Sequence, residues 1–115
     1  MIEKILYDFL SNATDIPVYT EIPADKPSRF YAFEKTGSTL KDHIEKSTIA
    51  VQSWGESLLD AAQMNKDVIS LMMNDLLVLP EIGGVSKNTD YNFTDPTTRR
   101  YRYQAVFVIT TQGGI

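Results

Sequence analysis

The residues that could support chemistry are few, and they gather in one polar segment. His43 is the only histidine, and Asp42 and Glu45 stand close to it in the sequence. An imidazole beside carboxylates can act as a general base, but a catalytic triad also needs a nucleophile held against it, and a metal site needs more ligands. The chain has no cysteine and no G-x-S-x-G motif. We therefore expect no catalytic residue, no metal site and no enzyme activity, and we interpret His43 as a loop residue.

Two further patterns carry no chemistry that we can assign. Paired carboxylates could act as an acid and a base, but several of the fifteen acidic residues fall on the exposed face of a predicted helix, where charge normally solvates the surface. Gly83 and Gly84 belong to neither of the glycine-rich motifs that bind phosphate, so they indicate a special backbone geometry. We expect no cofactor.

Composition limits the class of protein. The 115 residues, 43% hydrophobic and 23% charged, are typical of one globular domain, which we predict to span residues 1–115. The net charge of −4 is opposite to that expected of a nucleic-acid-binding protein, so we predict no sequence-specific nucleic-acid binding. No apolar stretch approaches the roughly 20 residues that span a bilayer, and Glu3 and Asp8 interrupt the apolar N-terminal segment, so we expect neither membrane insertion nor secretion.

Periodicity predicts the elements that must position these residues. An apolar stripe of Ile2, Ile5, Leu6 and Phe9 predicts a short helix ending near residues 11–12. After Pro17 we predict an extended segment over residues 18–22, and then a strand over residues 29–36 that ends at Gly37 and Ser38.

The next segment, residues 38–46, is strongly polar, and we predict a solvated loop there. Alternation resumes over residues 48–52, which predicts a third strand with Ile49 and Val51 on its buried face. Ser53 and Glu56 match a capping box, so we expect a long helix over residues 54–79 that Pro80 ends. Trp54 then stands in its first turn, buried or at an interface. The helical stripe consists of Leu58, Ala61, Ala62, Asn65, Val68, Ile69, Met72 and Leu76.

The residue pattern of the remaining third of the chain predicts two strands. Residues 82–90 predict a weak strand that is bulged or lies at an edge, and residues 91–98 predict a turn. Residues 99–111 give the strongest strand signal, with a central position in the sheet. The predicted fold is α+β, with a mixed or antiparallel sheet of about five strands and two helices packed on one face, in the order α-β-β-β-α-β-β. The expected core between sheet and long helix contains Ile49, Val51, Val68, Ile69, Met72 and Phe107.

Two clusters are candidate partner or subunit interfaces. The polar segment is longer than common hairpin loops and carries isolated apolar residues, so either it contacts a partner or it is a mobile tip. Three arginines form the one basic cluster, and the preceding residues 56–95 carry seven acids against two lysines. Either this asymmetry forms a self-complementary subunit contact, or the charges are solvated. The candidate residues are Thr39, Leu40, Lys41, Asp42, His43, Ile44, Arg99, Arg100 and Arg102.

The order of these features resembles the tail-terminator or tail-completion proteins of long, non-contractile-tailed bacteriophages and prophages. The similarity is carried by the short N-terminal helix, by Arg29-Phe30-Tyr31-Ala32-Phe33 before Thr36-Gly37, and by Ile49 to Trp54. It continues through Ala61-Ala62 and ends with the strand from Tyr101 to Phe107. It extends over nearly the whole chain as a profile of weakly specified positions.

The resemblance implies a non-enzymatic virion protein, made in the host cytoplasm, that forms a homohexameric ring at the head-proximal end of the tail tube. Such a ring ends tail polymerisation and provides the surface for head–tail joining, so its implied partners are itself, the tail tube protein and a neck or head-completion protein. Two alternatives remain open at this point. One is a head-closure or neck adaptor protein, and the other is a small-molecule-binding α+β domain.

Overall fold

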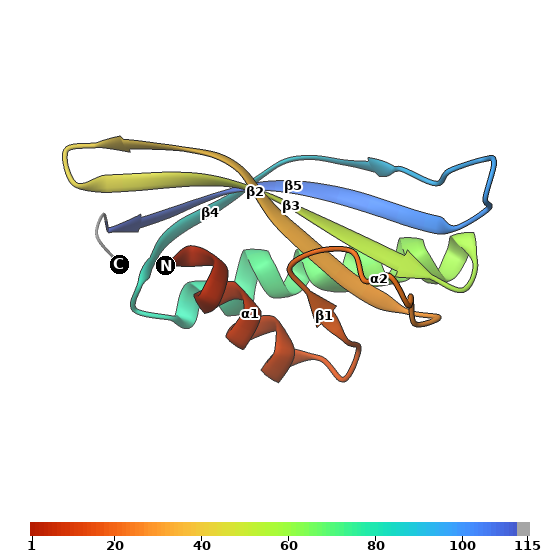
Figure 1. Ribbon diagram of the computed structural model, residues 1–115. Coiled ribbons are helices and arrows are strands. Elements are labelled where there is room, and N and C mark those ends of the chain that lie inside the picture. The colour runs from red at the N-terminus through yellow and green to blue at the C-terminus, as the bar shows by residue number, and fades with distance from the viewer. Residues whose placement is uncertain (113–115) are drawn as a thin grey trace.

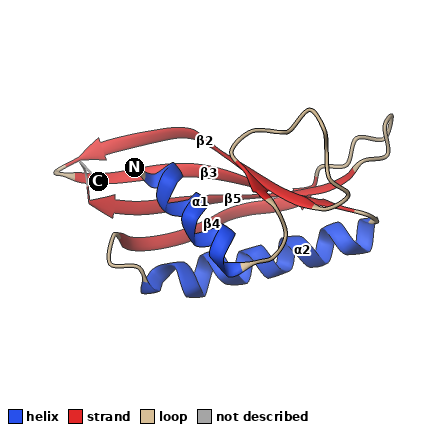
Figure 2. Ribbon diagram, turned by 60° about the horizontal axis from the view of Figure 1, so that its bottom comes forward, coloured by secondary structure: helices blue, strands red, loops and turns tan. Residues whose placement is uncertain are grey.

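The computed structural model of the protein describes residues 1–112. Five strands form one sheet in the order β1-β2-β3-β5-β4, and both helices lie against the same face of it (Figures 1 and 2). This arrangement confirms the predicted α+β class, with β1 parallel to β2 and the other neighbours antiparallel. The elements are α1 (Ile2–Ala13), β1 (Val18–Tyr19), β2 (Phe30–Lys41), β3 (Ile44–Gly55), α2 (Leu58–Ser70), η1 (Leu71–Asp75), η2 (Leu76–Val78), β4 (Ile82–Asn92) and β5 (Tyr101–Gln112).

The core fills the space between the helices and the sheet. Helix α1 contributes Ile2, Leu6 and Leu10, and the sheet contributes alternate residues of its central strands. Burying these apolar side chains is the main favourable term in folding. Of the six predicted core residues, five are fully buried and Ile69 packs against them with part of its surface exposed. The five are Ile49, Val51, Val68, Met72 and Phe107.

Helix α2 begins four residues later than predicted, because the predicted cap lies in a strand. Pairing of β3 with β5 continues to Gly55, which keeps Ser53 and Trp54 extended. The actual N-cap is Ser57, whose hydroxyl accepts a hydrogen bond from the Asp60 backbone N–H at 3.1 Å. The capping-box prediction and the placement of Trp54 in a helix were therefore wrong.

The C-terminal end of this helix agrees with the predicted limit. The helical path continues from Ser70 through the π-helical turn η1 and the 3₁₀ turn η2, and it ends at Val78, before Pro80. Proline lacks a backbone N–H and cannot continue the hydrogen-bond ladder. The predicted extended segment over residues 18–22 is shorter, since only Val18 and Tyr19 pair with β2.

The predicted loop over residues 38–46 is the largest error. The pairing of β2 with β3 runs from Phe30 and Trp54 to Lys41 and Ile44, with one bulge between Lys35 and Gly37. Gly37 does not end the strand. Polar side chains are compatible with strand structure here because most of this part of the hairpin is exposed to water.

The turn of this hairpin consists of two residues in the left-handed region. Asp42 has φ 53° and His43 has φ 64°. Positive φ at both central residues is the geometry of a type I′ turn, whose twist matches that of paired strands. Asp and His adopt this region more readily than most residues, so the turn forms without glycine.

The last two strands have the predicted roles. Strand β4 forms one edge of the sheet and has two bulges, between Ile82 and Gly84 and between Lys87 and Thr89, while β5 pairs on both sides with β3 and β4. The expected turn over residues 91–98 begins after Asn92. Within residues 1–112, no helix is long and apolar enough to cross a bilayer.

Truncating a core residue tests this packing. We expect Phe107→Ala to lower the free energy of unfolding by about 3–5 kcal/mol, since its fully buried ring meets both layers. Leu59→Ala is the matched control: this leucine is 84% exposed, so its truncation should change stability by less than about 0.5 kcal/mol. Urea unfolding curves of both variants measure the difference, and equal costs would contradict the assigned core.

Candidate functional site

The structure separates the predicted interface residues into two groups. The turn between β2 and β3 lies at one end of the sheet, and the connection between β4 and β5, which carries Arg99 and Arg100, lies at the other (Figure 1). The protein measures 45 × 25 × 25 Å, with the strands running along its length. The two groups therefore form two separate surfaces.

The first surface is the exposed half of the β2–β3 hairpin, which we call the hairpin tip and define as residues 37–46. Its end reaches beyond both helices in two views (Figures 1 and 2). Two apolar side chains are exposed there, Leu40 at 66% and Ile44 at 48%. Lys41, Asp42 and His43 are exposed beside them, so the tip presents apolar and charged groups together.

The second surface is the arginine end, and the structure divides its three arginines. Arg99 is exposed, with φ 55° and its backbone N–H donating to the Asp95 carbonyl. Arg100 and Arg102 instead contact the face of the Trp54 ring, at 5.4 and 4.8 Å from its centroid. Such cation–π contacts hold guanidinium groups against the subunit itself, so much of the predicted basic cluster has an internal role.

Trp54 belongs to a row of side chains that crosses the sheet on the face opposite the helices, which we call the open face. Phe30 stacks on Trp54 with centroids 5.1 Å apart, and Tyr19 meets the edge of Phe30. On the other side, the Arg102 guanidinium lies between the rings of Trp54 and Phe93, and its Nε donates to the Phe93 carbonyl at 2.7 Å. No pattern in the sequence indicated this row, because its members are far apart in the chain.

A chain of hydrogen bonds runs beside the aromatic row. The Trp54 indole N–H donates to Gln52, the Gln52 amide donates to Gln104, and the Gln104 amide donates to the Tyr91 hydroxyl at 2.6 Å. The chain joins β3, β5 and β4, so these side chains orient one another. We infer that the open face has a fixed arrangement of polar groups near Trp54.

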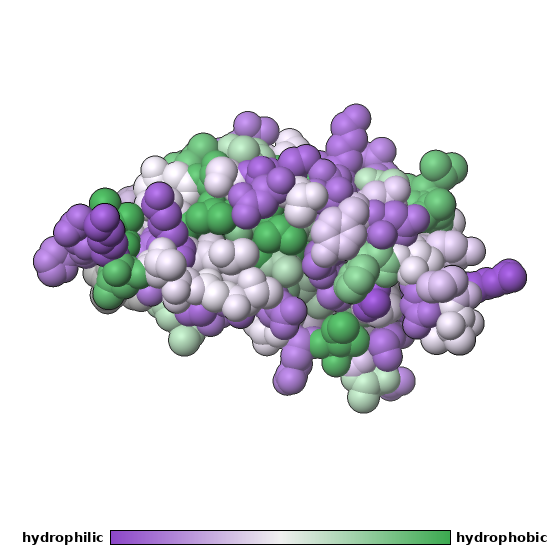
Figure 3. Space-filling model, turned by 90° about the horizontal axis from the view of Figure 1, so that it is seen from above, coloured by the Kyte–Doolittle hydropathy of each residue, from purple (hydrophilic) through white to green (hydrophobic). Residues whose placement is uncertain are grey.

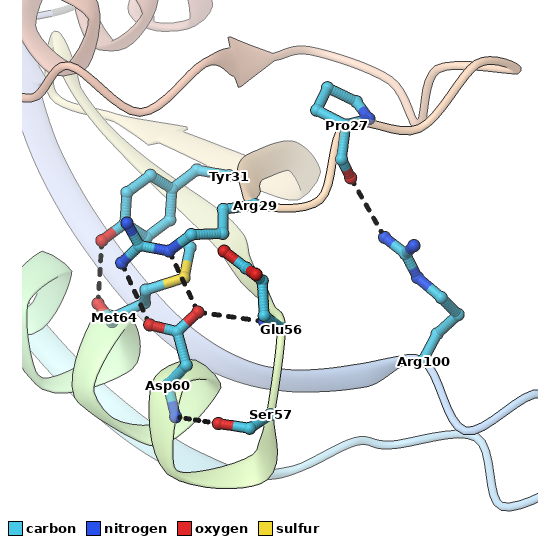
Figure 4. A network of polar contacts seen from close by, with 8 residues as sticks. All are labelled: Pro27, Arg29, Tyr31, Glu56, Ser57, Asp60, Met64 and Arg100. Carbon is cyan, nitrogen blue, oxygen red and sulfur yellow. Dashed lines mark hydrogen bonds and ion pairs between the residues drawn. The ribbon is translucent and has the colours of Figure 1, made fainter.

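A polar network fastens the start of β2 to the start of α2 (Figure 4). Arg29 donates two hydrogen bonds of 3.0 Å to the Asp60 carboxylate, which also accepts the Glu56 backbone N–H. The hydrogen bond from Glu56 and then the bonds and charge of Arg29 lower the pKa of Asp60. The end of β3 also packs closely on the start of α2, because a Cβ on Gly55 would lie 2.5 Å from the Ala61 nitrogen. The network fixes the layer geometry and leaves no free reactive group.

The open face also has a shallow hollow of about 340 Å³ between the segment after β1 and strands β2 and β3. Its floor is formed by the small side chains of Ala32 and Ala50, and Glu21, Ile22 and Glu34 stand at its rim. Figure 3 looks onto this face and shows polar and apolar side chains interspersed, with polar ones gathered at the hairpin tip. Within residues 1–112, no three Asp, Glu or His side chains are close enough to share a metal ion.

Comparison with models of known protein families and with curated proteins finds no match to this chain.

The buried Tyr31 hydroxyl predicts an alkaline loss of stability. Burial, followed by the negative charge of Asp67, raises the pKa of Tyr31 to about 12, and its hydroxyl donates to the Met64 carbonyl at 3.0 Å. Because the folded protein favours the neutral hydroxyl of Tyr31, this group contributes its full stability below a pH of about 10, where the unfolded chain also keeps the proton. The contribution is lost as the pH rises to the pKa of Tyr31 in the folded protein. We expect the stability advantage of the natural protein over Tyr31→Phe to shrink by roughly 2–3 kcal/mol between pH 10 and 12.

Denaturant unfolding at several pH values measures this difference. Tyr7→Phe is the control, because Tyr7 is 43% exposed and makes no described hydrogen bond through its hydroxyl within residues 1–112. A difference between the natural protein and Tyr31→Phe that stays constant from pH 8 to 12 would contradict the assignment.

The hairpin turn predicts a stabilising substitution. Replacing Asp42-His43 with Asn-Gly should raise the free energy of unfolding by about 1 kcal/mol, since these residues favour positive φ at the two turn positions. Val-Ile at the same positions is the opposite control and should destabilise the hairpin, because β-branched residues avoid this region. Thermal unfolding of the two variants distinguishes the turn from the loop that the sequence predicted.

Proposed function

We propose that the protein is a non-enzymatic virion subunit that caps the head-proximal end of a phage tail tube as a ring. In this function it ends tail polymerisation and provides the surface for head–tail joining. Its partners are other copies of itself, the tail tube protein and a neck or head-completion protein. A ring subunit needs lateral surfaces for its neighbours and two further surfaces for different axial partners.

The observation that carries this proposal is the elongated sheet with different surfaces at its two ends. The hairpin tip exposes Leu40 and Ile44 beside charged residues, and the arginine end exposes Arg99. Exposed apolar side chains on an otherwise charged surface favour contact with another protein. A subunit aligned with the tail axis would present one end to the tube and the other to the neck.

The segments that carry the family resemblance support the same proposal. Phe30 to Phe33, Ile49 to Trp54 and Tyr101 to Phe107 fall on the three neighbouring strands β2, β3 and β5. Their buried side chains form the core and the base of the open face. The resemblance therefore concerns residues that determine the fold, while partner choice belongs to the exposed ends.

A head-closure or neck adaptor protein is the second candidate, since the same two ends would serve it with other partners. The small-molecule alternative has less support. The hollow over Ala32 and Ala50 is shallow, and Glu21, Ile22 and Glu34 at its rim are exposed, whereas small-molecule sites usually enclose most of their ligand.

A shortened hairpin tests the proposal. Deleting two cross-strand pairs, Thr39 with Lys46 and Leu40 with Glu45, preserves the alternation of side chains toward the two faces. We expect stability to change by no more than about 1 kcal/mol, because Thr39, Leu40 and Lys46 are exposed and Glu45 is partly exposed. Tail completion should be lost when this variant replaces the natural protein in a phage complementation assay.

The Asn-Gly turn variant is the matched control, since it keeps the hairpin length and should support tail completion. Electron microscopy of the lysates would show tails of uncontrolled length or tails without heads for the shortened hairpin. Normal virions made with a stably folded shortened protein would contradict the proposed role of the hairpin tip.

A further inference from the structure

Two edges of the sheet remain unpaired within residues 1–112. Strand β1 covers β2 only at Tyr31 and Ala32, so β2 has no neighbour on its outer side from Phe33 to Lys41. At the opposite edge, β4 pairs only with β5 along Ile82–Asn92. Unpaired edges carry rows of free N–H and C=O groups, which are a template for strand addition.

We propose that the outer edge of β2 binds the β4 edge of a second copy of this chain, which extends the sheet from one ring subunit to the next. The proposal rests on the proposed ring. There the two ends of the subunit face axial partners, and the two edges are left to face neighbouring copies. The contact joins two different edges, so it repeats head to tail and can close into a ring.

The strand directions and heights of the two edges are compatible. Three successive antiparallel pairings make β4 run opposite to β2. A copy related by rotation about an axis parallel to the strands would therefore place its β4 antiparallel to β2. Residues at the same height follow from the pairing register: Glu34 shares a row with Thr89, Gly37 with Ser86, and Thr39 with Gly84.

The bulges of the two edges also coincide. The extra residue of β2 is Thr36, and the extra residue of β4 in the middle of the sheet is Asn88, one row away. Bulges bend a strand and increase its twist, so both edges bend at nearly the same height. Lys35 on one edge and Lys87 on the other lie at this height. Within its own copy, Lys35 forms an ion pair with Glu3, and Lys87 forms an ion pair with Asp90.

The hollow on the open face supplies a place for exposed aromatic side chains. Tyr91 and Phe93, each 40% exposed, lie at the end of β4, and Tyr91 shares a row with Ala32. In the extended sheet, the neighbour's Tyr91 comes level with Ala32, at the end of β1 and of the hollow, and Phe93 comes level with Phe30. Burying the exposed part of the Tyr91 ring at this end of the hollow would add apolar contact to the backbone pairing.

Cross-linking through introduced cysteines tests the contact, since the chain has no cysteine of its own. Gly37→Cys is suitable because a Cβ at Gly37 meets no atom within 4 Å, and Ser86→Cys places an exposed thiol in the same row. We expect a short bis-maleimide to join the two variants when they are mixed, and neither variant to itself. Gln63→Cys, exposed on α2, is the control that should not react with Gly37→Cys.

Leu40→Pro tests the backbone pairing itself. Lys41 and Ile44 flank the two-residue turn and bond to each other, so alternation points the N–H of Leu40 toward the free edge. Proline there removes an edge donor and leaves the hairpin ladder intact, and we expect about fivefold or more loss of cross-linked product. Leu40→Ala keeps the N–H and should cross-link normally, and circular dichroism confirms that both variants fold.

The outcomes separate this contact from the proposed function. Gly37→Cys linked to itself would mean β2 pairing with β2, and no link at any concentration, or links insensitive to Leu40→Pro, would overturn the proposal. If one of these cross-linking results is obtained but tail completion still requires the protein, only the proposed edge contact is wrong. If tails form normally without the protein, the proposed function is wrong as well.

Discussion

Continuous pairing of β3 on both sides is the constraint on which the rest of the structure depends. This strand joins β2 on one side and β5 on the other along nearly its full twelve residues. At about 3.3 Å per residue, strands of this length extend for roughly 40 Å, whereas the twelve residues of α1 extend for about 18 Å. The sheet is therefore longer than this helix, and its hairpin end lies beyond the helical layer.

The same pairing organises the open face. Because β3 stays extended to Gly55, Trp54 stands on the sheet, where Phe30 stacks on one side and Arg102 lies on the other. Residues far apart in the sequence thereby form one row across four strands, which ends at Phe93 just after β4. Arg100 and Arg102 keep their charges but are held against Trp54 and half-buried, so Arg99 is the most exposed arginine of the cluster.

Sequence patterns failed where exposure and pairing partners decided the structure. The polar residues from Ser38 to Lys46 have no apolar alternation, so nothing local distinguishes a loop from a strand exposed to water. Their strand structure follows from pairing with one another and, for residues from Ile44 onward, with β5. The same holds for Ser53 and Glu56, whose spacing matches a cap that the continued β3–β5 pairing makes impossible. The Tyr19–Phe93 row and the free outer edge of β2 had no local signal, whereas Gly83 and Gly84 indicated the bulged or edge position of β4.

The sequence by itself determined the elements whose residues alternate or repeat with a buried face. The stripe of α1, the stripe around Val68 and Met72, and the alternation through Phe107 predicted the layers, the core and the central place of β5. Burial imposes a period on these residues, and the period is visible in the sequence. Only the tertiary structure decided where the strands end, which end of the sheet each candidate residue occupies and how much of the outer edge of β2 stays open. Those features depend on pairing between distant segments, which imposes no period on the exposed residues.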